Sequence, residues 1–182
     1  RHGLSSDGAR GAGGIGASHL TTNQGYVLRG IADAGDGWSY LADNDGRLVH
    51  HRGSGWVVTA SWPRSGRQLQ RYWTQDKGSY SLVRHGIFIA KGETGVGACY
   101  LGRADTGYVV RGAWKSGTTI YLADNDGRLA AGSGWQVTGR YGQGLQRYYL
   151  YSMGSYSVAR HGLSSDGTRG AGGIGASHLT TN

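Results

Sequence analysis

The chain has 182 residues, of which 36 are glycine and one is proline, and its formal net charge at pH 7 is +8. So much glycine disfavours long helices, because each glycine costs about 0.8–1 kcal/mol inside a helix. Glycine does not recur at every third position, which excludes collagen, and no run reaches the roughly 18 apolar residues of a membrane helix. The positive charge favours anionic partners.

Repeated segments organise the chain from its first residue onward. Residues 1–23 return at 160–182 with one change, Ala9 against Thr168. The tripeptide RHG stands at 1, 84 and 160, which gives spacings of 83 and 76 residues. Four further segments occur in pairs: GYVLRG at 25–30 and GYVVRG at 107–112, YLADNDGRL at 40–48 and 121–129, GSGWVVT at 53–59 and GSGWQVT at 132–138, and LQRYW at 69–73 and LQRYY at 145–149.

A shorter repeat lies within the long one, in which a glycine precedes a large apolar residue. It begins at Gly3, Gly25, Gly55, Gly86, Gly107, Gly134 and Gly162, so that a short spacing is followed by two long ones, twice. Self-similarity of this kind is typical of stacked repeat proteins. The chain is therefore predicted to be one continuous array of units, roughly 1–24, 25–54, 55–85, 86–106, 107–133, 134–161 and a partial 162–182.

Each unit is expected to be one β-hairpin. GWVVTA at 55–60, GYVVRG at 107–112 and TTIYLAD at 118–124 are rich in β-branched and aromatic residues, as strands are. Asp-Gly at 45–46 and at 126–127 predicts a turn, because glycine accepts a positive φ. A lone hairpin is at best marginally stable in water, so at least three units must stack on a shared apolar seam.

The run GWSYLADNDGRLVHHRGSGW at 37–56 resembles the cell-wall-binding hairpin repeats of choline-binding and glucan-binding proteins of Gram-positive bacteria. YLADNDGRLAAGSGW at 121–135 matches comparably well, and LQRYYLYSMGSYSVARHG at 145–162 matches more loosely. The resemblance implies an all-β fold, a solenoid of stacked β-hairpins with about three hairpins per superhelical turn, which agrees with the grouping in threes. A β-trefoil lectin is the alternative fold, and it should stop after three units of equal length.

The same resemblance implies ligand sites between consecutive hairpins, where aromatic rings enclose a quaternary ammonium or stack on sugars. Carried over by position, Trp38, Tyr40 and Trp56 would form one such cage, and Thr119, Tyr121 and Trp135 a second one. Thr119 replaces the first tryptophan, which favours a general carbohydrate or cell-wall polymer over choline. The alternative is that these rings form the seam between hairpins.

Other motifs give no catalytic residue, metal site or cofactor. The run GAGGIG at 11–16 lacks the strand and helix of a dinucleotide fingerprint and predicts a turn. Asp43-Asn44-Asp45-Gly46 lacks the further ligands of a calcium loop and also predicts a turn. His50 and His51 would point to opposite faces of a strand, which disfavours their binding one shared metal ion. Cys99 is the one cysteine and is expected to be an apolar filler. No G-x-S-x-G or H-E-x-x-H motif occurs, so the chain is predicted not to be an enzyme.

Arginines recur at matching unit positions, namely Arg29, Arg71, Arg84, Arg111, Arg147 and Arg160. Such a basic stripe suits an anionic wall polymer, and no nucleic-acid motif accompanies it. We therefore predict a non-catalytic, extracellular or cell-surface module that binds cell-wall polysaccharide or another anionic glycan polymer, with no membrane partner. The alternative is a structural repeat protein that forms a surface fibre or stalk by self-association. A third hypothesis is the targeting module of an enzyme whose catalytic domain lies outside this chain.

Overall fold

The computed structural model describes strands, turns and bridges, and no helix, in the residues that it places. Those residues are 3–6, 17–60, 62, 69–91, 97–141, 144–160, 162–165 and 177–180. No helix able to span a lipid bilayer is found in these ranges. The chain divides into two compact units: unit 1 is Arg1–Phe88 with Gly102–Val109, and unit 2 is Ile89–Leu101 with Val110–Asn182. The predicted turn at 11–16 lies outside the described residues.

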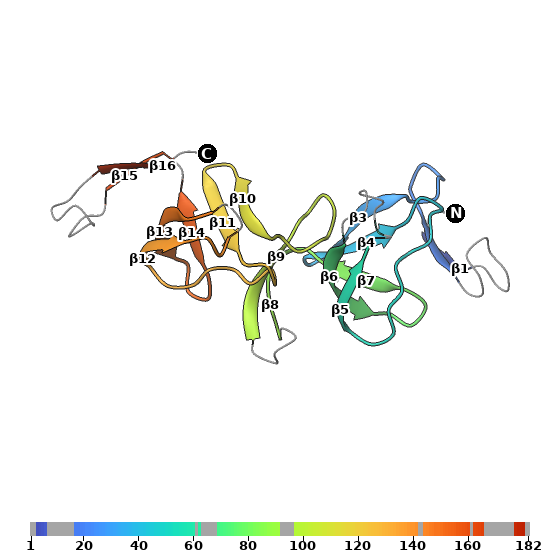
Figure 1. Ribbon diagram of the computed structural model, residues 1–182. Coiled ribbons are helices and arrows are strands. Elements are labelled where there is room, and N and C mark those ends of the chain that lie inside the picture. Colours follow the sequence, from blue (N-terminus) through green and yellow to red (C-terminus); the bar gives the residue numbers. More distant parts are fainter. Residues whose placement is uncertain are drawn as a thin grey trace. The chain divides into compact units, whose positions relative to one another are not determined.

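Unit 1 contains a five-stranded antiparallel sheet (Figure 1). In spatial order its strands are β3 (Gly30–Gly35), β4 (Trp38–Ala42), β7 (Ser81–Arg84), β6 (Gln70–Asp76) and β5 (Gly55–Thr59). A separate hairpin pairs β1 (Gly3–Ser6) with β2 (Ser18–Thr21). The hairpins β3–β4 and β5–β6 are therefore joined through β7, which follows both of them in the chain.

Unit 2 repeats this arrangement with the same strand order. Its sheet runs β10 (Gly112–Ser116), β11 (Thr119–Ala123), β14 (Ser157–Arg160), β13 (Gln146–Ser152) and β12 (Gly134–Thr138). Two further two-stranded sheets pair β8 (Gly86–Lys91) with β9 (Gly97–Gly102), and β15 (Gly162–Ser165) with β16 (Ser177–Thr180). The prediction of an all-β chain of antiparallel hairpins is confirmed for the described residues.

The turns explain why the hairpins form where they do. Asp36 and Gly37 join β3 to β4 with φ values of 52° and 77°, and two consecutive positive φ angles match the twist of a two-residue hairpin. The predicted Asp-Gly turns are confirmed, with φ of 80° at Gly46 and 81° at Gly127. At Gly46 a Cβ would lie 2.3 Å from Val27 Cγ1, so a side chain is excluded there on steric grounds as well.

One strand prediction is wrong. GYVVRG at 107–112 is not a strand, because strand β10 begins only at Gly112. Val109 forms an isolated bridge with Gly102, while its backbone N–H donates to the carbonyl of Arg71. The segment pairs with different neighbours at successive residues, so it builds no continuous ladder. GWVVTA and TTIYLAD are confirmed as β5 and β11.

The core lies on one face of each five-stranded sheet. On β4 the side chains of Ser39 and Leu41 are buried, whereas Trp38 and Tyr40 between them are only half-buried. This alternation follows from the period of two along a strand, and β11 shows the same pattern of burial. The unit 1 core joins Leu41, Val49, Tyr72 and Val83, and the unit 2 core joins Ile120, Leu122, Ala130, Tyr141, Leu150 and Ala159.

Opposite each core lies a smaller apolar cluster beside the half-buried rings. In unit 1 it consists of Leu28, Ala42 and Leu48, and in unit 2 of Cys99, Val110, Ala123 and Leu129. The thiol of Cys99 is free and buried, and burial raises its pKa. The prediction that Cys99 is an apolar filler is therefore confirmed.

The turn at 43–46 gives a first testable prediction. Asp43 Oδ1 accepts hydrogen bonds from the backbone N–H of Asp45 at 2.9 Å and of Arg47 at 3.0 Å. Asp43→Ala leaves both donors without their acceptor, and we expect it to lower the free energy of unfolding by about 1–2 kcal/mol. Asp43→Asn retains a carbonyl oxygen and should cost less than about half of that in urea denaturation. An equal loss for the two variants would contradict this role of the side chain.

Candidate functional site

The five predicted site residues lie on four strands. Trp38 and Tyr40 share one face of β4, whereas Trp56 lies on β5. In unit 2, Tyr121 lies on β11 and Trp135 on β12. Two strands separate β4 from β5, and two separate β11 from β12. Trp38 and Tyr40 are thus neighbours on one strand, but neither predicted cage draws its rings from adjacent strands.

Tyrosine pairs recur at matching positions in both units. The Tyr40 and Tyr80 ring centroids lie 5.9 Å apart with the planes at 33°. In unit 2 the Tyr121 and Tyr156 centroids lie 6.3 Å apart at 29°, in a stacked arrangement. All four rings are half-buried and pack against the smaller apolar cluster of their own unit. Each pair therefore combines a fixed position with a partly exposed aromatic surface.

Unit 2 adds a third ring at this place. Trp114 on β10 lies directly opposite Tyr121 on β11 and packs against the same apolar cluster. The matching position in unit 1, opposite Tyr40, is held by Ala32. We call Trp114, Tyr121 and Tyr156 the unit 2 ring face. Thr119, which the sequence placed in the second cage, is half-buried at the start of β11.

The phenol groups of Tyr80 and Tyr156 remain protonated at neutral pH. Burial raises the pKa of Tyr156, and the neighbouring Tyr121 raises it further. Burial likewise raises the pKa of Tyr80, with Tyr40 contributing. A neutral phenol both donates and accepts hydrogen bonds, and its ring covers the apolar face of a flat ligand. Such a surface can contact the hydroxyl groups and the C–H face of a sugar together.

The three predicted tryptophans each have an arginine of the same chain over the ring. The guanidinium carbon lies 3.9 Å from the ring centroid for Arg71 over Trp56, 4.3 Å for Arg147 over Trp135 and 5.1 Å for Arg84 over Trp38. Arg84 also donates to the backbone carbonyl of Asp36. A ligand cation that binds the same ring face would have to displace the arginine, because both are attracted by that face. The tryptophan faces therefore disfavour a quaternary ammonium ligand.

The predicted basic stripe is thus divided between two environments. Arg71 is buried beside Trp56, whereas Arg29, Arg111 and Arg147 are exposed. The side chain of Arg160 lies outside the described residues. Among the residues that the structure places, no group of three or more His, Cys, Asp or Glu side chains could hold a metal ion.

Sequence reasoning missed Tyr80, Tyr156 and Trp114. The signal for the two tyrosines was available, since GSYS occurs at 78–81 and again at 154–157. Trp114 stands five residues before Thr119 at the other end of a short hairpin, so counting across the turn would have placed it opposite Tyr121.

Solved structures to which this chain is similar include three of pneumococcal proteins. Choline-binding protein F from Streptococcus pneumoniae is 18% identical, with a TM-score of 0.41, and the match covers 97% of this chain and 48% of that protein. CbpJ from Streptococcus pneumoniae is 17% identical, with a TM-score of 0.40 and coverages of 92% and 54%. Choline-binding protein F in the presence of a peptidoglycan analogue (tetrasaccharide-pentapeptide) is 21% identical, with a TM-score of 0.40. That match covers 87% of this chain and 41% of that protein.

The chain spans about half the length of these proteins. Choline-binding proteins, which the sequence resemblance predicts, are among the solved structures to which the chain is similar. No protein-family model matches the chain, and no curated protein matches it.

Proposed function

We propose that this chain is a non-catalytic, extracellular module that binds cell-wall polysaccharide or another glycan polymer through its half-buried aromatic rings. The observation that carries the proposal is the recurrence of one tyrosine pair, Tyr40–Tyr80 and Tyr121–Tyr156, at matching positions of two units. A polymer with repeating sugars can contact several such positions at once, and each added contact raises the overall affinity.

The proposal includes the architecture that the sequence resemblance implies. The predicted units, from 1–24 to the partial unit 162–182, would stack as a solenoid with about three hairpins per superhelical turn. Rings at matching positions of successive units would then recur along the array. The net charge of +8 favours an anionic polymer among the candidate glycans.

A pelleting assay with purified Gram-positive cell walls tests the proposal. We expect the full chain to sediment with the walls, and Tyr121→Ala and Trp114→Ala to weaken binding by about threefold to tenfold each. This range corresponds to the roughly 0.5–1.5 kcal/mol that one aromatic contact contributes. Tyr26→Ala is the matched control, because Tyr26 is 73% exposed and lies outside both tyrosine pairs. Equal losses for Tyr26→Ala and Tyr121→Ala would contradict the assignment.

Competition by free choline separates a glycan site from an ammonium cage. Because arginines lie over Trp38, Trp56 and Trp135, we expect choline not to release the chain from the walls. Release by choline would contradict the glycan assignment. Filaments seen by electron microscopy without any wall binding would instead support the self-association alternative.

A further inference from the structure

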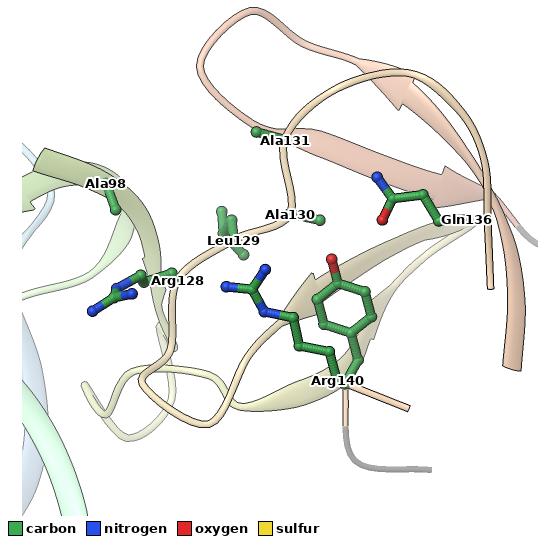
Figure 2. A pocket seen from close by; sticks show the side chains of 8 residues that line it. Ala98, Arg128, Leu129, Ala130, Ala131, Gln136 and Arg140 are labelled. Carbon is green, nitrogen blue, oxygen red and sulfur yellow. The ribbon is translucent and has the colours of Figure 1, made fainter. Parts of the chain in front are cut away.

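A cavity of about 270 Å³ lies within unit 2. The cavity is lined by residues 128–131, which connect two strands, and by Ala98, Gln136, Arg140 and Tyr141. Figure 2 shows the side chains of Gln136 and Arg140 near Ala130. None of the three ring-face residues lines it. Its volume falls just below the roughly 300–1,000 Å³ of pockets for drug-sized molecules, so it suits one small ligand or a single group of a larger one.

The polar side chains of this cavity are mainly hydrogen-bond donors. Figure 2 shows the guanidinium of Arg140 and the amide of Gln136 pointing toward the same space beside Ala130. A guanidinium presents five N–H donors in a planar fork, and the amide adds two more. Such a fork matches the paired oxygens of a carboxylate or phosphate.

Arg140 is held in place before any ligand arrives. Its Nη2 donates to Asp124 Oδ2 at 2.9 Å. Asp124 is buried, and its Oδ1 accepts the backbone N–H of Asp126 at 3.0 Å and of Arg128 at 2.9 Å. The backbone turn at 124–128 therefore fixes the Asp124 carboxylate, and this carboxylate holds one edge of the Arg140 guanidinium. A preorganised donor loses less side-chain entropy when it binds.

The third donor is Tyr141, which is 5% exposed and belongs to the unit 2 core. Burial raises the pKa of its phenol, so the hydroxyl keeps its proton at neutral pH. Its ring packs edge-on against Tyr148, with the centroids 5.9 Å apart. This contact fixes the ring that lines the cavity.

The acidic groups around the cavity are already paired. The Asp124 carboxylate faces Arg140, and the Asp126 carboxylate pairs with Arg128 at 3.3 Å. In Figure 2 the Arg128 guanidinium points away from that of Arg140. Arg140 is thus the cation of the cavity, and the neutral donors of Gln136 and Tyr141 supplement it.

The polar residues that line the cavity occur in unit 2 and have no polar equivalents of the same kind at the matching positions of unit 1. Aligning GWQVTGRY at 134–141 with GWVVTASW at 55–62 places Val57 against Gln136, Ser61 against Arg140 and Trp62 against Tyr141. Strands β5 and β12 nevertheless show the same pattern of burial. The β5–β6 hairpin of unit 1 therefore forms without Gln136, Arg140 and Tyr141 or their equivalents. Folding of the hairpin alone does not explain why unit 2 has these three donors.

We propose that this cavity binds a small oxyanion group, a carboxylate or a phosphate, through Arg140, Gln136 and Tyr141. This site goes beyond the proposed function, because its ligand is recognised by charge and not by an aromatic face. A free anion and an anionic group on a polymer share this chemistry.

The test is a nuclear magnetic resonance titration of the full chain with two probes, inorganic phosphate and glucuronate, at constant ionic strength set by chloride. We expect saturable shifts of the Arg140 and Gln136 side-chain signals with at least one probe. The probe that binds more tightly distinguishes a phosphate from a carboxylate ligand. Arg140→Ser should weaken binding by at least about tenfold, as the loss of a charge-assisted hydrogen bond does.

Two further variants keep the result decisive. Gln136→Val introduces the unit 1 residue and keeps the Arg140–Asp124 pair, so it should fold even where Arg140→Ser does not, and it should weaken binding by about threefold or more. Lys115→Ser also removes one positive charge, from an exposed position of unit 2 that belongs neither to the cavity nor to the predicted basic stripe, and it should leave binding unchanged. Absence of saturable shifts, or equal weakening by Lys115→Ser and the two cavity variants, would overturn the proposal.

Discussion

Truncation of either central leucine, Leu41→Ala in unit 1 or Leu122→Ala in unit 2, is expected to lower the free energy of unfolding by about 2–5 kcal/mol. Both side chains are 0% exposed and lie in the core of their five-stranded sheet. The loss combines the transfer free energy of the removed methyl groups with the cavity that they leave. Such small cores have few other buried side chains that could fill the space.

Exposed leucines supply the matched controls. Leu69 in unit 1 is 62% exposed and Leu145 in unit 2 is 80% exposed. Leu69→Ala and Leu145→Ala make the same chemical change and should alter the free energy of unfolding by no more than about 0.5 kcal/mol. Urea denaturation followed by circular dichroism measures all four variants. Similar values for Leu122→Ala and Leu145→Ala would show that the inward face of β11 is not the core.

Much of the local fold could be predicted because it depends on short-range chemistry. The period of two in WSYLA and TIYLA places Leu41 and Leu122 on the buried face, as β4 and β11 show. Asp-Gly at 45–46 forms a turn because glycine alone tolerates the φ of 80° without strain. These features need only neighbouring residues, so a single sequence determines them.

The joining strands β7 and β14 could not be predicted in the same way. Ser81–Arg84 and Ser157–Arg160 are four residues long, and their apolar residues alone do not say where they pair. The register of β4 with β7 places Trp38 opposite Arg84, far away in the sequence. A contact of this kind depends on how two hairpins meet, which no local pattern encodes. The wrong strand at 107–112 has the same origin, since Val109 bonds to Arg71 of another segment.

The candidate site shows the same division between local and distant information. The sequence predicts Tyr40 and Tyr121 as ligand-contacting rings, and the structure places both on a half-buried face of their strands. Their partners Tyr80 and Tyr156 come from the turns before β7 and β14, so the pairs depend on the joining strands. The arginines over Trp56 and Trp135 lie diagonally across two paired strands, and only the register reveals such contacts. Ligand binding by the five predicted residues stays a prediction.

The stability of unit 1 at high pH should depend on Tyr72. This side chain is 1% exposed, and its hydroxyl is buried without a hydrogen-bond partner among the described residues. Burial, with Tyr108 contributing, raises the pKa of Tyr72 far above the ordinary tyrosine value of about 10. The folded state therefore holds the proton more tightly than the unfolded state does. The contribution of the protonated Tyr72 to the free energy of unfolding is fully present below about pH 10, and it is lost as the pH rises further.

Tyr72→Phe removes this proton and should flatten the alkaline loss of stability. Between the unfolded and folded pKa values, each pH unit costs the wild-type chain about 1.4 kcal/mol for this one group. At pH 7 the variant should be as stable as the wild type or more stable, because phenylalanine buries no unpaired hydroxyl. Tyr148→Phe changes the matching, half-buried tyrosine of unit 2 and should flatten the slope less. Urea denaturation at a series of pH values from 7 upward measures how the free energy of unfolding changes with pH. Equal slopes for Tyr72→Phe and the wild type would mean that Tyr72 has the same pKa in the folded and unfolded states.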